Sequence, residues 1–133
     1  AILRVKLQHL ADDNAKRREI ALRYNEGFKG FPLTLPSISE KERHAMHLYV
    51  IECDRRNELM KYLRSHQIGA SLHYPLPVHQ HAAYANRIRG WDNLPVTDQL
   101  YQRNLTLPIY PELSNDEVEH IISMIQIWFQ EKK

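Results

Sequence analysis

The residues that could do chemistry are concentrated in one short stretch, residues 73–81. It holds three imidazoles, the Tyr74 phenol and two prolines. Each proline fixes its own φ near about −65° and biases the residue before it, Tyr74 or Leu76, toward extended backbone. A stiff loop that carries polar rings favours holding a ligand over filling a core. The alternative is a strand end that turns into a short helix with solvated histidines.

The three imidazoles of this loop could also bind a metal. His73, His79 and His81 lack the i, i+4 spacing of a helical pair, and the loop contains no carboxylate or thiolate. Histidine spacing alone is a weak sign of zinc, so we predict no metal site. His44 and His47 flank the start of a predicted strand, and we interpret them as structural or solvated.

Other kinds of catalytic site find little support. No glycine-rich phosphate loop and no nucleophile elbow is present. Cys53 is the single cysteine, which excludes an internal disulfide, and its apolar neighbours predict a buried, inert thiol. Asp12, Asp13 and Glu19 belong to a charged helix face that solvent covers. We therefore predict no catalytic residue within this chain.

Length and composition are those of one ordinary globular domain. The chain has 133 residues, 43% hydrophobic and 26% charged, with a net charge of +2. Acids are interspersed with the basic residues, so neither a nucleic-acid nor a membrane partner is indicated. No apolar run approaches the roughly 20 residues of a membrane span, and no charged-then-apolar leader is present. The simplest interpretation is a soluble, cytoplasmic protein.

The elements that must position the loop begin with a predicted helix over residues 2–28, about 40 Å long at about 1.5 Å per residue. Asn14 and Arg17 interrupt its apolar stripe midway. The helix could be a coiled-coil arm, but a bridge to a partner domain is favoured. No capping residue precedes Ala1, so we expect the chain to be cut out of a longer one. The stripe and the residues that end the helix are Leu3, Leu7, Leu10, Ala21, Tyr24 and Phe28, then Gly27, Gly30 and Pro32.

The remaining pattern predicts strands and helices in alternation. Ser114 and Glu117 form a capping box for the last helix, which runs to the charged tail at 131–133. Its apolar stripe is Val118, Ile121, Ile122, Ile125 and Trp128. The earlier elements are a Pro-rich connection over 31–40, a strand over 45–53, a helix over 55–66 capped by Asp54 with Leu59, Tyr62 and Leu63 buried, a strand over 70–74, a short helix over 82–88, a helix over 97–104 and a strand over 105–109.

Three short strands and several helices predict an α+β fold. We expect a two-layer domain in which a short, mainly antiparallel three-stranded sheet packs on helices and the long N-terminal helix enters it.

Several motifs follow one another along nearly the whole chain. They are Ala1-Ile2-Leu3-Arg4-Val5-Lys6-Leu7, then Asn14, Arg17 or Arg18, Ile20-Ala21 and Tyr24, His47-Leu48-Tyr49-Val50-Ile51, Gly69-Ala70-Ser71-Leu72-His73-Tyr74-Pro75-Leu76-Pro77-Val78-His79, Ala83-Tyr84, and Leu107-Pro108-Ile109-Tyr110-Pro111-Glu112-Leu113. In this order they resemble the sugar aminotransferase family called DegT/DnrJ/EryC1/StrS, and together they are specific.

This resemblance implies that residues 1–133 are the C-terminal small domain of a longer enzyme, with 1–28 as an interdomain helix. Such enzymes use pyridoxal phosphate, bound to a lysine of the larger N-terminal domain, to move an amino group from glutamate to a nucleotide-linked keto sugar. The full-length protein would be a homodimer. No lysine ahead of the charged tail matches the family's cofactor-binding context, which puts in doubt any activity of this chain alone. These lysines are Lys6, Lys16, Lys29, Lys41 and Lys61.

The resemblance also implies that His73 and Tyr74 reach the nucleotide-sugar pocket, with His79 as the next candidate. An imidazole and a phenol can donate hydrogen bonds to diphosphate or sugar oxygens, which agrees with the loop chemistry above. The sequence of the loop is most similar to that of family members that act on thymidine-diphosphate 3-keto-6-deoxy sugars. Two other hypotheses are a stand-alone ligand-binding or regulatory module that uses the same loop, and a helix-mediated scaffold dimer.

Overall fold

The computed structural model of the chain describes residues 1–37, 39, 42–84, 87, 89–90 and 92–132. These residues form, in order, α1 (Ile2–Leu7), α2 (Leu10–Gly27), β1 (Tyr49–Glu52), α3 (Arg56–Ser65), the 3₁₀ helix η1 (Val78–Gln80), α4 (Pro95–Arg103), β2 (Asn104–Leu107) and α5 (Asn115–Glu131). The predicted α+β class is confirmed. Residues 85, 86 and 88 of the predicted 82–88 helix lie outside the described residues, as do Glu40, Lys41 and Lys133.

The described sheet has two antiparallel strands, so the prediction of three strands is wrong. β1 and β2 pair from Tyr49 opposite Leu107 to Glu52 opposite Asn104. The predicted strand over 70–74 is reduced to a single bridge between Ser71 and Thr106. Beyond Ser71 the backbone leaves the sheet. The carbonyl of His73 accepts from the side chain of Asn104, and the two prolines that follow have no amide hydrogen to donate to a neighbouring strand.

Both confirmed strands are shorter than predicted, for local reasons. Met46 has a φ of 47°, in the left-handed region, so the extended backbone expected from residue 45 begins only at β1. β2 ends at Leu107 because the next residue, Pro108, cannot donate a ladder hydrogen bond.

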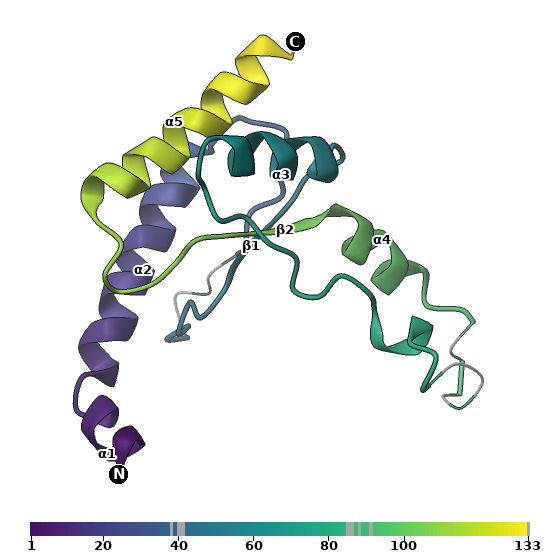
Figure 1. The fold of residues 1–133 in the computed structure, drawn as a ribbon, viewed down its shortest axis with the longest axis horizontal. Helices are drawn as coiled ribbons and strands as arrows, with labels where there is room; N and C mark the ends of the chain where they lie inside the picture. Colours follow the sequence, from purple (N-terminus) through teal and green to yellow (C-terminus); the bar gives the residue numbers. More distant parts are fainter. Residues whose placement is uncertain (38, 40–41, 85–86, 88, 91, 133) are drawn as a thin grey trace.

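The predicted continuous helix over residues 2–28 is interrupted. Gln8 and His9 form a turn whose amides bond three residues back, to Val5 and Lys6, and the second helix starts at Leu10. None of the residues of α1 is buried, and Leu7 is 67% exposed. Without tertiary packing from the described residues, α1 is not held in line with α2. Figure 1 shows this N-terminal segment projecting away from the body.

The starts of two further helices differ from the predictions. Asp54 does not cap α3; its carboxylate oxygen lies 3.0 Å from Arg103 Nε in an ion pair, and Arg55 occupies the cap position without a side-chain cap bond. α3 buries Leu59 and Leu63 as predicted and leaves Tyr62 half-buried. α4 begins two residues before the predicted start because a proline is favoured in the first turn of a helix, where its missing N–H would have no partner.

The core lies where α2, α3 and α5 pack around the two strands (Figure 1). The predicted capping box is confirmed, and the whole predicted stripe of α5 is buried. Tyr24 stacks on Phe28 and tilts against Tyr49, and its hydroxyl donates to the carbonyl of Pro108. The buried apolar residues are Ile20, Ala21, Tyr24, Phe28, Met46, Tyr49, Ile51, Cys53, Leu59, Leu63, Ile68, Ala70, Leu105, Leu107, Ile109, Val118, Ile121, Ile122, Ile125 and Trp128.

α2 and α5 approach closely at Gly27. A Cβ atom at this glycine would lie 2.6 Å from Cγ2 of Ile122, and the Gly27 carbonyl accepts a 2.8 Å hydrogen bond from Gln126. Glycine therefore lets the two helices touch at this point.

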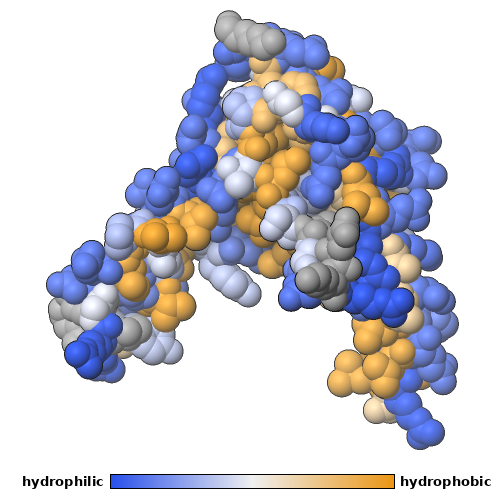
Figure 2. Space-filling model, turned by 180° about the vertical axis from the view of Figure 1, so that it is seen from behind, coloured by the Kyte–Doolittle hydropathy of each residue, from blue (hydrophilic) through white to orange (hydrophobic). Residues whose placement is uncertain are grey.

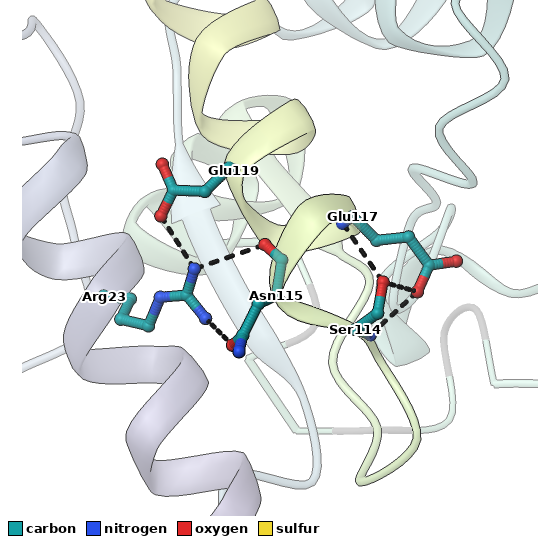
Figure 3. A network of polar contacts seen from close by, with 5 residues as sticks. All are labelled: Arg23, Ser114, Asn115, Glu117 and Glu119. Atoms are coloured by element: carbon teal, nitrogen blue, oxygen red, sulfur yellow. Dashed lines mark hydrogen bonds and ion pairs between the residues drawn. The ribbon is translucent and has the colours of Figure 1, made fainter.

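Nearer the start of α5, Arg23 reaches across from α2. Its guanidinium donates to Asn115 and, at 2.7 Å, to Glu119 (Figure 3). The side chains are partly exposed, so this contact aligns the helices more than it stabilises them.

No described helix combines the length and the hydropathy that a membrane crossing needs.

Candidate functional site

The 73–81 loop and α4 form an arm that leaves the body of the molecule (Figure 1). Between them lies a groove of about 650 Å³, within the size range of about 300–1,000 Å³ that is common for ligand pockets. Figure 2 shows hydrophobic surface along this arm. The described residues that line the groove are Tyr74, Pro75, Leu76, Pro77, Val78, His79, His81, Leu94, Thr97, Leu100, Tyr101 and Asn104.

The base of the loop is tied to β2. Nδ1 of His73 lies 3.0 Å from the hydroxyl oxygen of Thr106, a buried residue of β2. The carbonyl of His73 accepts a hydrogen bond of 3.4 Å from the side-chain amide of Asn104. Both ring and backbone are therefore held at the point where Tyr74 leaves the body. Tyr74 is 73% exposed, so its phenol is free to meet a ligand.

The tip of the loop is tied to α4 by a carboxylate. Oδ1 of Asp98 lies 3.0 Å from Nε2 of His79 and accepts a 2.7 Å bond from the side-chain amide of Gln80. Because an ionised carboxylate only accepts, the His79 imidazole donates from Nε2. His79 is 5% exposed, so its ring fills space between loop and helix as well as lining the groove.

Arg56 fixes the far end of α4. It is buried on α3, and its Nη1 donates to the carbonyls of Tyr101 and Asn104, each at 3.2 Å. Carbonyls at the end of a helix lack partners within the helix, and a cation there is favoured by the helix dipole. α4 has no buried residue of its own. Polar contacts at its two ends therefore hold it in place.

The structure separates the three residues that the sequence suggested as ligand contacts. Tyr74 and His79 line the groove, whereas His73 lies behind it, against β2. His81, which also lines the groove, places Nε2 3.2 Å from the carbonyl of Leu76. Of the three suggested residues, Tyr74 is the most exposed.

Sequence reasoning missed the contribution of α4 to the site. Tyr101 and Asn104 line the groove, and Asp98 and Asn104 contact His79 and His73, which lie 19 and 31 residues away in the sequence. The available signal was Val96 and Leu100, two apolar residues four apart on one face of α4; the structure leaves both exposed, at 69% and 44%.

The remaining candidate groups do not form a metal site in the described residues. No group of three His, Cys, Asp or Glu side chains within them is placed to hold a metal ion. Cys53 is buried, and burial raises the pKa of its thiol, as an inert cysteine requires. His44 and His47 are exposed, and Nδ1 of His44 accepts a 2.9 Å hydrogen bond from the amide of Met46.

The sequence also matches a known family along most of its length. The model of the DegT/DnrJ/EryC1/StrS aminotransferase family matches residues 1–126. The chain belongs to this family. Family members are sugar aminotransferases that depend on pyridoxal phosphate.

Two curated relatives illustrate the similarity. A dTDP-3-amino-3,6-dideoxy-alpha-D-galactopyranose transaminase of Aneurinibacillus thermoaerophilus is 35% identical over 127 residues, which are 94% of this chain and 34% of that protein. A dTDP-3-amino-3,4,6-trideoxy-alpha-D-glucose transaminase of Streptomyces venezuelae is 33% identical over 129 residues, 96% of this chain and 34% of that protein. The chain therefore spans about a third of the length of the curated relatives it matches.

Solved structures of the family share the fold. DesV of S. venezuelae, solved in complex with a ketimine intermediate, superposes with a TM-score of 0.90 at 32% identity, over 96% of this chain and 34% of DesV.

The groove of this DegT/DnrJ/EryC1/StrS chain is not built to anchor the family cofactor. No lysine is among the described residues that line it, so it offers no amine for the covalent link to pyridoxal phosphate.

Proposed function

We propose that this chain forms the C-terminal small domain of a homodimeric aminotransferase. The enzyme would transfer an amino group from glutamate to a nucleotide-linked keto-deoxysugar, with thymidine-diphosphate 3-keto-6-deoxyhexoses as the preferred class. In this proposal residues 1–28 link the domain to a larger N-terminal domain. The proposal rests on the groove, which a stiff loop lines on one side. The names of two relatives, both transaminases of dTDP-linked amino sugars, support the substrate class.

The loop residues would bind the nucleotide-sugar without taking part in proton transfer. The exposed phenol of Tyr74 can donate to a phosphate or sugar oxygen. His73 uses Nδ1 for Thr106, which leaves Nε2, unpaired among the described residues, for a substrate oxygen. Nε2 of His79 is hydrogen-bonded to Asp98, so His79 would contact the substrate through Nδ1 or the face of its ring.

Pyridoxal phosphate would supply the amino-transfer chemistry from the rest of the enzyme. The chain alone should then be inactive and should form no covalent link to the cofactor. Borohydride reduction of the chain with pyridoxal phosphate, followed by peptide mass analysis, tests this. A single lysine modified stoichiometrically would refute it.

Two half-reactions measured separately test the binding role. A hydrogen bond to a charged group contributes about 1.5–3 kcal/mol, so His73→Ala or Tyr74→Phe should lower kcat/KM for the sugar half-reaction roughly 10- to 150-fold, mainly through KM. Pro75→Ala, which loosens the loop but removes no donor, should act in the same direction and less.

The glutamate half-reaction serves as the internal control, because no nucleotide-sugar takes part in it. It should remain unchanged in all three variants. Tyr110→Phe, a phenol outside the groove, is the matched control for Tyr74→Phe. Equal slowing of both half-reactions would place these residues in the catalytic centre and contradict the assignment.

A further inference from the structure

We propose that the groove between the loop and α4 takes the nucleobase of the nucleotide-sugar, and that the diphosphate binds elsewhere. This inference rests on the function proposed above and assigns one part of that substrate to one surface. The groove is defined by its described lining residues on 74–81 and 94–104.

The charge of the groove argues against a diphosphate. No lysine or arginine is among its described lining residues. Its buried imidazole, His79, already donates to a carboxylate, Asp98, which would repel an anion at this wall. Moving a doubly charged group out of water without a cation to pair with is strongly unfavourable. The groove therefore suits the uncharged end of the ligand.

The shape and polarity of the groove favour a flat ring over a sugar. Tyr101 comes from the helix wall, and aromatic side chains stack on nucleobases of any sequence. Tyr74, at the base of the loop, keeps its hydroxyl for the phosphate or sugar oxygen assigned to it above. Leu100 and Val78 are exposed in the groove and would be covered by such a ring. The hydroxyls of a hexose would meet these apolar walls without partners, whereas a pyrimidine has only an edge to satisfy.

The polar side chains of the groove suit the hydrogen-bonding edge of a pyrimidine. Thr97 and Tyr101 line the groove, and the hydroxyl of each can donate or accept. The carbonyl oxygens of thymine need donors, and its methyl group needs an apolar surface of the kind that Leu94 provides. A thymine base thus matches the few polar and many apolar groups of the site.

Competitive inhibition of the intact enzyme by three probes tests the assignment. The probes are dTDP, thymidine and inorganic pyrophosphate, each measured against the nucleotide-sugar substrate. Leu100→Asn should raise the inhibition constants of dTDP and thymidine roughly 5- to 20-fold and leave that of pyrophosphate unchanged. Val78→Asn, on the opposite wall, should repeat the pattern. Leu22→Asn, an exposed leucine on α2, is the matched control and should change none of the three.

Each other outcome contradicts the inference. If pyrophosphate weakens as much as thymidine, the groove binds the diphosphate. If both groove variants leave all three constants unchanged and only lower the melting temperature, the groove is a packing face for the rest of the enzyme. In either case dTDP still inhibits the wild-type enzyme and the proposed function stands. If dTDP does not inhibit the wild-type enzyme at all, the proposed function fails and this inference fails with it.

Discussion

Asp98→Ala should loosen the arm without unfolding the core. The carboxylate accepts hydrogen bonds from His79 and Gln80, the two contacts that join the loop tip to α4. Its removal leaves the Nε2–H of a buried imidazole without an acceptor. Because α4 buries none of its own residues, the loss should be felt within the arm.

The size of the effect follows from the burial of the two partners. A buried donor left without a partner costs about 1–3 kcal/mol. The Asp98 side chain is 38% exposed, and water already weakens the contact on that side, so we place the loss at about 1–2 kcal/mol. A free energy of this size changes an opening equilibrium by a factor of about 5–30.

Amide hydrogen exchange is the suitable assay because it reports local opening. Amides in the second half of α4 should exchange roughly 5- to 30-fold faster in Asp98→Ala than in the wild type. Amides in the middle of α5, which belongs to the core, should not change. Gln102→Ala, an exposed position on the same helix, is the matched control.

Asp98→Asn separates the hydrogen bonds from the charge. The amide keeps an oxygen acceptor for both partners, so this variant should retain most of the protection. If Asn is as damaging as Ala, the carboxylate acts through the charge at the start of α4 and not through His79. Unchanged exchange in Asp98→Ala, or equal acceleration in α4 and α5, would refute the reasoning.

Three further predictions concern the body of the molecule. Leu7→Asp should change the free energy of unfolding by less than about 0.5 kcal/mol because Leu7 is exposed, whereas Tyr24→Asp should prevent folding because Tyr24 is fully buried; urea titrations of both variants check this. Cys53 should react with a thiol reagent far more slowly in the native protein than in urea, because burial hides the thiol and raises its pKa. Hydrogen bonds from the amide and hydroxyl of Ser114 lower the pKa of Glu117. Their contribution to the free energy of unfolding is therefore present above the usual pKa of about 4.5 and is lost as pH falls through the lower folded-state pKa. Urea titrations across this range should show that Ser114→Ala loses less stability on acidification than the wild type.

The features that the sequence predicted well are those determined by neighbours along the chain. The capping box of Ser114 and Glu117 involves residues three apart, and the stripe of α5 repeats every three or four residues. The sequence also predicted that the apolar stripe of the first helix is too long for this domain to cover, and the leucines of α1 are exposed.

The features that the sequence did not predict depend on contacts between distant residues. The left-handed backbone of Met46 shortens β1, and no glycine marks it in the sequence. The predicted strand over 70–74 had the right composition, but the carbonyl of His73 accepts from the side-chain amide of Asn104, 31 residues away, and not from a backbone amide of β2. Asp98 meets His79 across 19 residues. No local pattern indicates such pairings, so the loop was visible in the sequence and the groove was not.

The close packing at Gly27 determines whether a Gly27→Ala substitution would stabilise this protein. Replacing a helical glycine by alanine is a standard choice, worth about 1 kcal/mol from helix propensity and from the restricted unfolded chain. At this position the added methyl group would sit 2.6 Å from Ile122, a buried side chain on α5. Ile122 or one of the two helices would have to shift, and the core between them would lose contacts. A design method that scores residue 27 by propensity alone would therefore predict the wrong sign.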